Sequence, residues 1–158
     1  MKRIAPLLIL VLFLSQNIIA QEKRPLKNLD VFDMEWAADP QISPQGDRIV
    51  YLRRGFDIMK DGTQTQLWIV NSDGSEHRLL FQGSASSPRW SPNGQQLAYT
   101  SGGQIHVYDF ATKQSTEITS VQQSPSGISW SPDGQHIAFS MFIPTAAPSL
   151  VAPPKKPK

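Results

Sequence analysis

One ten-residue unit occurs three times in this chain and restricts its fold more than any other feature. The clearest copy is residues 130–139, WSPDGQHIAF, the second is residues 90–99, WSPNGQQLAY, and the more divergent first copy is residues 42–51, ISPQGDRIVY. Successive copies begin 48 and 40 residues apart. A period of roughly 40–50 residues is typical of β-propeller blades. The repeat therefore predicts an all-β chain built from successive blades.

Each copy predicts a strand, a tight turn and a second strand. The proline of the Ser-Pro-X-Gly sequence fixes φ at the value that a type I turn needs, and the glycine can adopt a positive φ. After the turn, bulky apolar residues flank a small or β-branched one, as in Ile137-Ala138-Phe139, which suits a strand buried on both faces. The alternative is a single β-sandwich with coincidental Ser-Pro turns, and three copies with matching flanks favour the propeller.

Two further β-rich segments follow each of the first two copies. They are residues 66–70 and 76–80 after the first copy, and residues 104–108 and 115–118 after the second. Four strands in each repeat make one antiparallel blade. We therefore predict a partial propeller of about two and a half blades over residues 39–143, divided into 39–82, 83–120 and an incomplete 121–143. Closed propellers contain roughly four to eight blades, so we expect further blades from a longer protein or from assembled copies.

The two ends of the chain differ in composition from the repeats. Residues 1–20 carry two basic residues, an apolar run too short to span a bilayer and a small residue, Ala20, before Gln21, which predicts a secretory signal peptide. The alternative is an uncleaved N-terminal anchor. Residues 21–38 predict a leader with a short helix over residues 30–37, capped by Asp30. Residues 144–158 are rich in Pro and Lys and predict an extended linker or loop.

Charge and cysteine content exclude several classes of protein. The chain has 15 basic and 13 acidic residues, and without Lys2 and Arg3 the two counts are equal. A neutral balance gives no reason to expect nucleic acid, or an anionic membrane surface, as a partner. The chain contains no cysteine, so neither a disulfide framework nor a lipoprotein anchor is available. We predict a periplasmic or secreted protein with no membrane association beyond export.

An insertion over residues 53–62 accounts for most of the extra length of the first repeat. Its first residues, Arg53 and Arg54, are the candidate contacts to a substrate or partner, because loops at blade edges often carry the contacts of a propeller. A guanidinium group there could bind a carboxylate. The alternative, which the sequence favours, is that both arginines lie in solvent beside Asp57 and Asp61.

Other chemistry finds little support in the sequence. His77, His106 and His136 fall in different repeats without metal-ligand spacing, so we predict neither a metal site nor a cofactor. The sequence contains no Gly-X-Ser-X-Gly nucleophile elbow. The closest stretch, residues 124–127, lacks the first glycine. We therefore assign no catalytic residue within this chain.

The three Ser-Pro-X-Gly units resemble the WD-like repeats of the Tol-system periplasmic propeller protein and of the N-terminal propeller of prolyl-oligopeptidase-family serine peptidases. Two further stretches resemble the acylaminoacyl- and dipeptidyl-peptidase-like members of that peptidase family. One is residues 33–44 with residues 53–59 after it, and the other is residues 140–144 leading into the Pro/Lys-rich segment. The resemblance covers residues 29–158 and is more specific for fold than for function.

The resemblance implies a function that this chain cannot perform alone. In the peptidase family a C-terminal α/β-hydrolase domain carries the Ser-Asp-His triad, and the propeller screens it so that only short peptides enter. The expected partners are therefore that hydrolase domain and a peptide substrate, and we expect the chain to be the non-catalytic front part of such a peptidase. The alternative is a TolB-like periplasmic propeller that binds other proteins and has no enzymatic activity.

Overall fold

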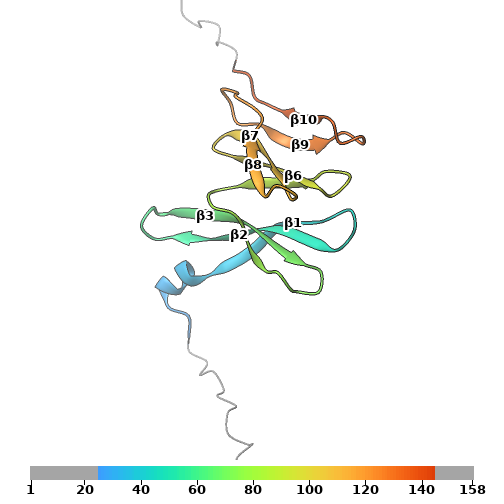
Figure 1. Ribbon diagram of the computed structural model, residues 1–158. Helices are drawn as coiled ribbons and strands as arrows, with labels where there is room; N and C mark the ends of the chain where they lie inside the picture. Colours follow the sequence, from blue (N-terminus) through green and yellow to red (C-terminus); the bar gives the residue numbers. More distant parts are fainter. Residues whose placement is uncertain (1–24, 145–158) are drawn as a thin grey trace, which may run out of the picture. The chain divides into compact units, whose positions relative to one another are not determined.

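The computed structural model describes residues 25–144 (Figure 1). The predicted signal peptide at residues 1–20, and residues 145–158 of the predicted linker or loop, lie outside the described residues. Contacts divide the chain after Asp30, and every described strand belongs to the second part, Val31–Lys158.

Ten strands form three antiparallel sheets, which we call blades 1, 2 and 3 (Figure 1). In chain order the elements are η1 (Asn28–Asp33), β1 (Glu35–Ile42), β2 (Arg48–Asp57), β3 (Gly62–Asn71), β4 (Arg78–Phe81), β5 (Ser86–Trp90), β6 (Gln96–Ser101), β7 (Gln104–Asp109), β8 (Gln114–Glu117), β9 (Ser126–Trp130) and β10 (Ile137–Ser140). Blade 1 has the order β1-β2-β3-β4, blade 2 has β5-β6-β7-β8, and blade 3 has only β9 and β10. The prediction of about two and a half four-stranded antiparallel blades is confirmed.

The Ser-Pro-X-Gly turn has the same hydrogen bonds in all three copies. Its glycine N–H donates to the serine carbonyl at 2.9 Å. The serine Oγ accepts the N–H of the residue five positions later, at 3.0 Å in the first copy and 2.9 Å in the other two. The turn glycines Gly46, Gly94 and Gly134 have φ values of 74°, 68° and 70°, a region in which a side chain is strained. The recurring Ser and Gly are thus both required by one local geometry.

A β-bulge recurs on the first strand of each blade. Asp39, Ser87 and Gly127 each lie four residues before the turn serine, and their φ values are 45°, 52° and 61°. The strand register shifts at the same three places. A bulge bends a strand and increases its twist. The three blades therefore share a bend of the first strand that the Ser-Pro-X-Gly pattern does not reveal.

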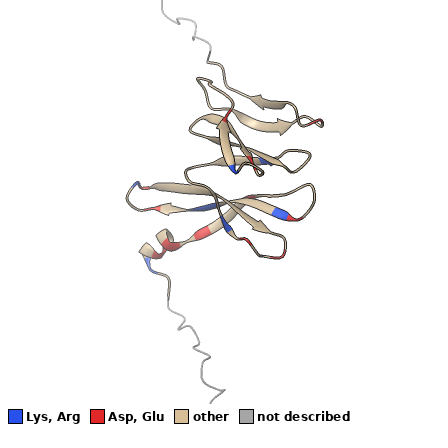
Figure 2. Ribbon diagram, in the orientation of Figure 1, with Lys and Arg blue, Asp and Glu red and all other residues tan. Residues whose placement is uncertain are grey.

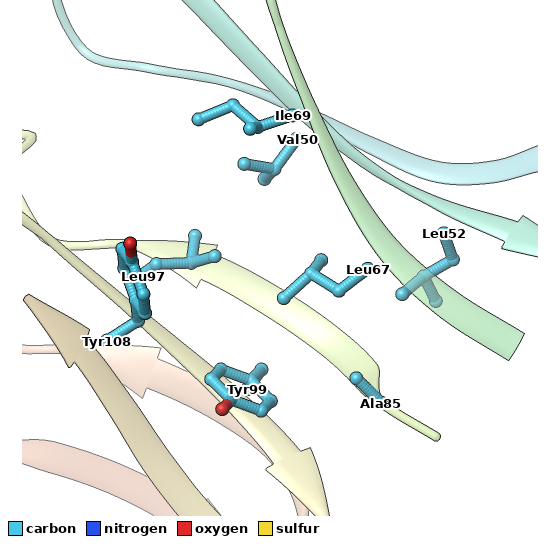
Figure 3. Close-up of a cluster of buried hydrophobic side chains, with 8 residues drawn as sticks. All are labelled: Val50, Leu52, Leu67, Ile69, Ala85, Leu97, Tyr99 and Tyr108. Atoms are coloured by element: carbon cyan, nitrogen blue, oxygen red, sulfur yellow. The ribbon is translucent and has the colours of Figure 1, made fainter. Parts of the chain in front are cut away.

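Apolar side chains between adjacent blades form the core. Val50, Leu52, Leu67 and Ile69 of blade 1 face Leu97, Tyr99 and Tyr108 of blade 2, and Figure 3 shows these side chains gathered with Ala85 between the strands. Leu52, Leu67, Leu97 and Tyr99 are at most 1% exposed. A smaller buried cluster, Ala98, Ile105 and Ile128, joins blade 2 to blade 3. The stability of the fold therefore comes mainly from the faces between the blades.

One hydrogen bond recurs at both blade junctions. The indole N–H of Trp90 donates to the Gln41 carbonyl of blade 1 at 3.0 Å, and the indole N–H of Trp130 donates to the Arg89 carbonyl of blade 2, also at 3.0 Å. Gln41 and Arg89 occupy the same position of the repeat, two residues before the turn serine. The tryptophan that opens a repeat unit thus fastens its blade to the preceding one.

Two sequence predictions about blade 1 were wrong in detail. The short helix expected over residues 30–37 is the 3-10 helix η1, which ends at Asp33, and Glu35 already begins β1. The strand replaces the helix because this segment pairs with β2, with Glu35 opposite Gly55. The insertion expected at residues 53–62 is not a loop, because β2 continues to Asp57 and β3 starts at Gly62.

Candidate binding surface

The extra residues of the first repeat lengthen a β-hairpin. The β2–β3 ladder contains ten residue pairs and ends with Asp57 opposite Gly62, whereas the equivalent β6–β7 ladder contains six and ends with Ser101 opposite Gln104. We call the end of this longer hairpin, residues 53–66, the blade 1 arm; it consists of the four additional residue pairs and the pair Arg53–Gln66 that precedes them. Polar residues with moderate strand propensity build it, so cross-strand pairing rather than local sequence makes it a hairpin.

The structure places the two predicted contact residues on opposite faces of the arm. Successive residues of a strand point to opposite faces, and Arg53 and Arg54 are adjacent in β2. Arg53 Nε donates to Glu35 Oε2 at 3.0 Å, and the guanidinium carbon lies 4.8 Å from the centre of the Trp68 ring. The carboxylate that pairs with Arg53 therefore comes from β1, not from Asp57 or Asp61.

Arg54 lies opposite Trp36 in the β1–β2 ladder. Its Nε atom is buried and has no hydrogen-bond acceptor among the described residues. This buried Nε atom is closed to a ligand, but the terminal Nη groups of the half-buried side chain, unlike those of Arg53, form no ion pair among the described residues. Arg54 is therefore the better of the two arginines for binding a carboxylate or carbonyl oxygen.

Apolar side chains surround the same end of the arm. The Trp36 and Phe56 rings lie 5.3 Å apart, and the Phe32 and Phe56 rings 6.5 Å apart. At the tip, Ile58 is 56% and Met59 is 89% exposed. Exposed apolar residues gathered at one place indicate a contact surface more strongly than scattered ones do. Sequence reasoning found the arginines here but missed Trp36, because residues 30–37 were expected to form a helix.

A second polar group lies on the first strands of blades 1 and 2. Arg89 Nη1 is 3.0 Å from Asp39 Oδ2, and Gln41 Nε2 donates to Asp39 Oδ1 at 2.8 Å. Asp39 is held at the bulge of β1, so its carboxylate is positioned by the strained backbone. The repeat offers one sequence signal for this site, since Asp39-Pro40 occupies the position of Ser87-Pro88 in the next copy.

The three histidines have structural partners and do not meet. His77 Nε2 lies 2.6 Å from the Tyr51 hydroxyl, His106 lies 3.7 Å from Glu117, and His136 lies 3.9 Å from Asp133. Within residues 25–144 no group of three or more His, Asp or Glu side chains could hold a metal ion.

Shifted pKa values occur mainly in turns and in the core. A hydrogen bond from Ser131 lowers the pKa of Asp133, and one from Ser43 lowers the pKa of Asp47. Burial raises the pKa of Tyr99. Each of these groups belongs to a repeated turn or to the core between blades, which indicates a structural role.

Figure 2 shows that charged residues of both signs are interspersed along the strands and turns. No helix among the described residues is long and apolar enough to cross a membrane.

Comparison with known proteins places these repeats in a known context. Residues 56–125 match the family described as the dipeptidyl peptidase IV (DPP IV) N-terminal region. Dipeptidyl-peptidase 5 of Porphyromonas endodontalis is 42% identical over 60 residues, which cover 37% of this chain and 9% of that protein. The Tol-Pal system protein TolB of Albidiferax ferrireducens is 32% identical over 87 residues, which cover 51% of this chain and 20% of that protein.

A solved structure supports the same fold. The acylaminoacyl peptidase of Pyrococcus horikoshii superposes with a TM-score of 0.68 at 19% identity, over 85% of this chain and 22% of that one. The chain therefore spans less than a quarter of the length of each of these three proteins.

Proposed function

We propose that this chain is the non-catalytic propeller part of a secreted or periplasmic serine peptidase. The reason is that it carries an N-terminal propeller of the kind found in prolyl-oligopeptidase-family peptidases. The observation that carries the proposal is the match of residues 56–125, from the arm to the end of blade 2, to the dipeptidyl peptidase IV N-terminal region. The nucleophile, base and oxyanion donors would come from an α/β-hydrolase domain of the same polypeptide, and the substrates would be short peptides.

The blade 1 arm is the part of this chain that we assign to contacts with the peptide substrate or the hydrolase domain. Arg54 offers a half-buried guanidinium group that forms no ion pair among the described residues, and Ile58 and Met59 offer exposed apolar surface. Peptides present carbonyl oxygens, a terminal carboxylate and apolar side chains, which match both features. Arg53 has a different role in this proposal, because Glu35 and Trp68 already hold it.

The natural gene product tests the proposal directly. An antibody raised against residues 29–143 and a fluorophosphonate probe for active serine hydrolases should label the same species in the source cells. We expect that species to be much heavier than 17.6 kDa. An antibody-positive species that the probe never labels, while other hydrolases in the lysate are labelled, would contradict the peptidase function.

A pair of substitutions in that gene product tests the role of the arm. Arg54→Gln should raise KM for peptide substrates by about tenfold or more, because hydrogen bonds to charged groups are worth roughly 1.5–3 kcal/mol. Arg78→Gln is the matched control, since Arg78 is exposed and lies in β4, outside the arm. Equal KM values in both variants would exclude Arg54 as a contact.

A second candidate function follows from the 32% identity to TolB. In this alternative the chain belongs to a periplasmic propeller that binds other proteins and catalyses no reaction. The same labelling experiment separates the two functions, because an interaction propeller would contain further repeats but no probe-reactive serine. Both functions place the protein outside the cytoplasm, and sequencing the N-terminus of the mature protein should then find Gln21.

A further inference from the structure

The outer edge of β3 is covered by β4 over only part of its length. β3 runs from Gly62 to Asn71, and β4 pairs with it only at residues 67–69. Residues 62–66, which form one side of the blade 1 arm, pair with β2 alone among the described residues. The third strand of blade 1 therefore begins with a stretch whose outer edge has no neighbouring strand.

The hydrogen-bond pattern shows which backbone groups of this stretch point outward. At the far end of the β2–β3 hairpin, the Ser72 N–H donates to the Asp47 carbonyl at 2.8 Å, and the ladder continues from there in register through all ten pairs. Antiparallel strands exchange hydrogen bonds at every second pair, so the even-numbered residues of β3 bond to β2. Thr63 and Thr65 thus direct their N–H and C=O groups outward, where they have no partner among the described residues.

The equivalent edge in blade 2 is covered. β8 pairs with the last four residues of β7. Before them, the outward N–H of Ile105 donates to Thr119 Oγ1 at 2.9 Å, and the Ile105 carbonyl accepts the N–H of Ile118, also at 2.9 Å. The third strand of blade 2 is thus covered from its second residue on, whereas the third strand of blade 1 is uncovered over residues 62–66.

A groove follows the uncovered edge. It has a volume of about 310 Å³, and each of residues 62–66 lines it. Successive side chains of a strand point to opposite faces of the sheet, so a groove lined by consecutive residues lies along the edge of the strand and not over one face. Residues 82–84, which follow β4, also line the groove. A chain that lies in the plane of the sheet would therefore occupy it.

The composition of the edge suits pairing with another chain. Residues 62–66, GTQTQ, include neither a charged residue nor a proline, which are common means of protecting an edge strand from added strands. The charged residues that line the groove are Asp57 and Lys60, and these lie 3.5 Å apart and pair with each other. The described lining thus offers backbone groups, hydroxyls and amides, but no unpaired charge.

We infer that the groove binds an uncharged, extended peptide segment, which adds to blade 1 as a strand antiparallel to β3. Two residues of the segment lie opposite Thr63 and Thr65 and exchange about four backbone hydrogen bonds with them. Hydroxyl and amide side chains suit the segment, because they can pair across the strands with the threonines and glutamines of β3. The inference goes beyond the proposed function, since such a site holds a peptide without cleaving it and needs no hydrolase domain.

A second copy of β3 fits the groove less well than a single peptide strand. A twofold pair that used all of residues 62–66 would place Gly62 opposite Gln66 of the second copy. The residue after Gln66 is Leu67, which is already paired with Phe81. β4 of the second copy would therefore lie in line with the tip of this arm and compete with it for space. A single strand brings no such neighbour.

Binding of a defined peptide to the full-length natural protein tests the inference. The probe is the uncharged peptide Ser-Thr-Gln-Thr-Gln-Thr-Ser with blocked ends and a fluorescent label on a flexible linker, and its anisotropy reports binding. A version with N-methyl groups on its three central residues keeps every side chain but loses backbone donors. It should bind at least about tenfold more weakly than the probe. Equal binding of the two peptides, or no binding of the probe, would overturn the inference.

Substitutions of Thr65 test the same contact from the side of the protein. Thr65→Pro removes an outward N–H but no bond to β2, and proline is tolerated on an edge strand where its nitrogen faces solvent. Thr65→Val changes the side chain and keeps the N–H. We expect Thr65→Pro to bind the probe at least about tenfold more weakly than Thr65→Val, with equal urea midpoints showing that both variants are folded. Equal affinities in the two folded variants would overturn the inference.

The oligomeric state separates a peptide from a second copy as the occupant. If Thr65→Pro changed the sedimentation coefficient of the protein but not its affinity for the probe, the edge would belong to a second copy and the inference would be wrong. None of these measurements uses fluorophosphonate labelling. Probe binding by an unlabelled protein would therefore contradict the peptidase function alone, and a labelled protein that does not bind the probe would contradict the inference alone.

Discussion

The substitution Trp90→Phe tests whether the indole hydrogen bond stabilises the blade junction. Trp90 Nε1 donates to the Gln41 carbonyl at 3.0 Å, across the junction between blades 1 and 2. The indole ring also stacks on Phe110 at 5.0 Å and lies 5.0 Å from the guanidinium carbon of Arg48. Phenylalanine keeps an aromatic ring in this stack but has no N–H to donate.

Three contributions set the expected loss of stability. The hydrogen bond contributes about 0.5–1.5 kcal/mol. The smaller ring buries less apolar area, which costs about 1 kcal/mol. The contact with Arg48 also weakens, by a fraction of the roughly 0.5–1 kcal/mol that such cation–aromatic pairs contribute. We expect a total of about 2 kcal/mol. With a urea dependence of roughly 1–3 kcal/mol per molar, the unfolding midpoint should fall by about 1 M.

Urea unfolding followed by far-UV circular dichroism measures this shift. Trp36→Phe is the matched control, because Trp36 is 39% exposed and its indole makes no hydrogen bond among the described residues. The control should change the free energy of unfolding by less than about 0.5 kcal/mol. Equal shifts for the two variants would show that the tryptophans contribute only ring area and that the recurring hydrogen bond does not hold the blades together.

Three other predictions concern the turns and the arm. Gly94→Ala and Gly46→Ala should each destabilise by about 1–2 kcal/mol in thermal melts, because both positions need a positive φ and the exposed Gln45 side chain that an added Cβ at Gly94 would meet can move away; an unchanged melting temperature in either variant would contradict this reasoning. Asp133→Asn should leave stability near neutral pH almost unchanged, since Asn93 makes the same bonds in the second copy. Because folding lowers the pKa of Asp133, the ionised carboxylate stabilises the fold above pH 3.8, the unfolded pKa, and this contribution is lost on acidification. The urea midpoint should therefore fall less in the variant than in the unmodified protein as the pH is lowered, and an equal fall in both would refute the effect. Arg54→Met should leave the free energy of unfolding unchanged or raise it by up to about 1 kcal/mol in urea titrations, because it removes a buried donor without an acceptor; a loss above 1 kcal/mol would mean that the guanidinium has a partner.

The blades could be predicted because local chemistry determines their turns. Proline and glycine limit the backbone at the Ser-Pro-X-Gly unit whatever surrounds it, and the three turns indeed share one set of hydrogen bonds. The alternation of bulky and small residues then assigns the flanking strands. Such signals depend on a few adjacent residues, so a single sequence is enough to read them.

The arm and the start of β1 could not be predicted, because pairing between distant residues determines them. Residues 53–57 include two arginines, a glycine and an aspartate, which favour a loop when considered alone. They become a strand because residues 62–66 and β1 pair with them on either side. Likewise, the partner of Arg53 is Glu35, which is 18 residues away along the chain. The candidate arginines were therefore found from the sequence, but their opposite orientations were not.

The bulge on the first strand and the indole hydrogen bond at the blade junction occur at a fixed spacing that the sequence pattern does not show. The positive-φ residue lies two positions before the carbonyl that accepts the indole bond, Asp39 before Gln41 and Ser87 before Arg89. A non-glycine residue in this conformation costs roughly 1–2 kcal/mol, a cost that persists only where surrounding contacts offset it. Blade 3 has the same bulge at Gly127, two positions before Ser129. By its position in the repeat, Ser129 is the equivalent of Gln41 and Arg89, whose carbonyls accept an indole N–H, so the bulge recurs together with the acceptor position of the junction bond.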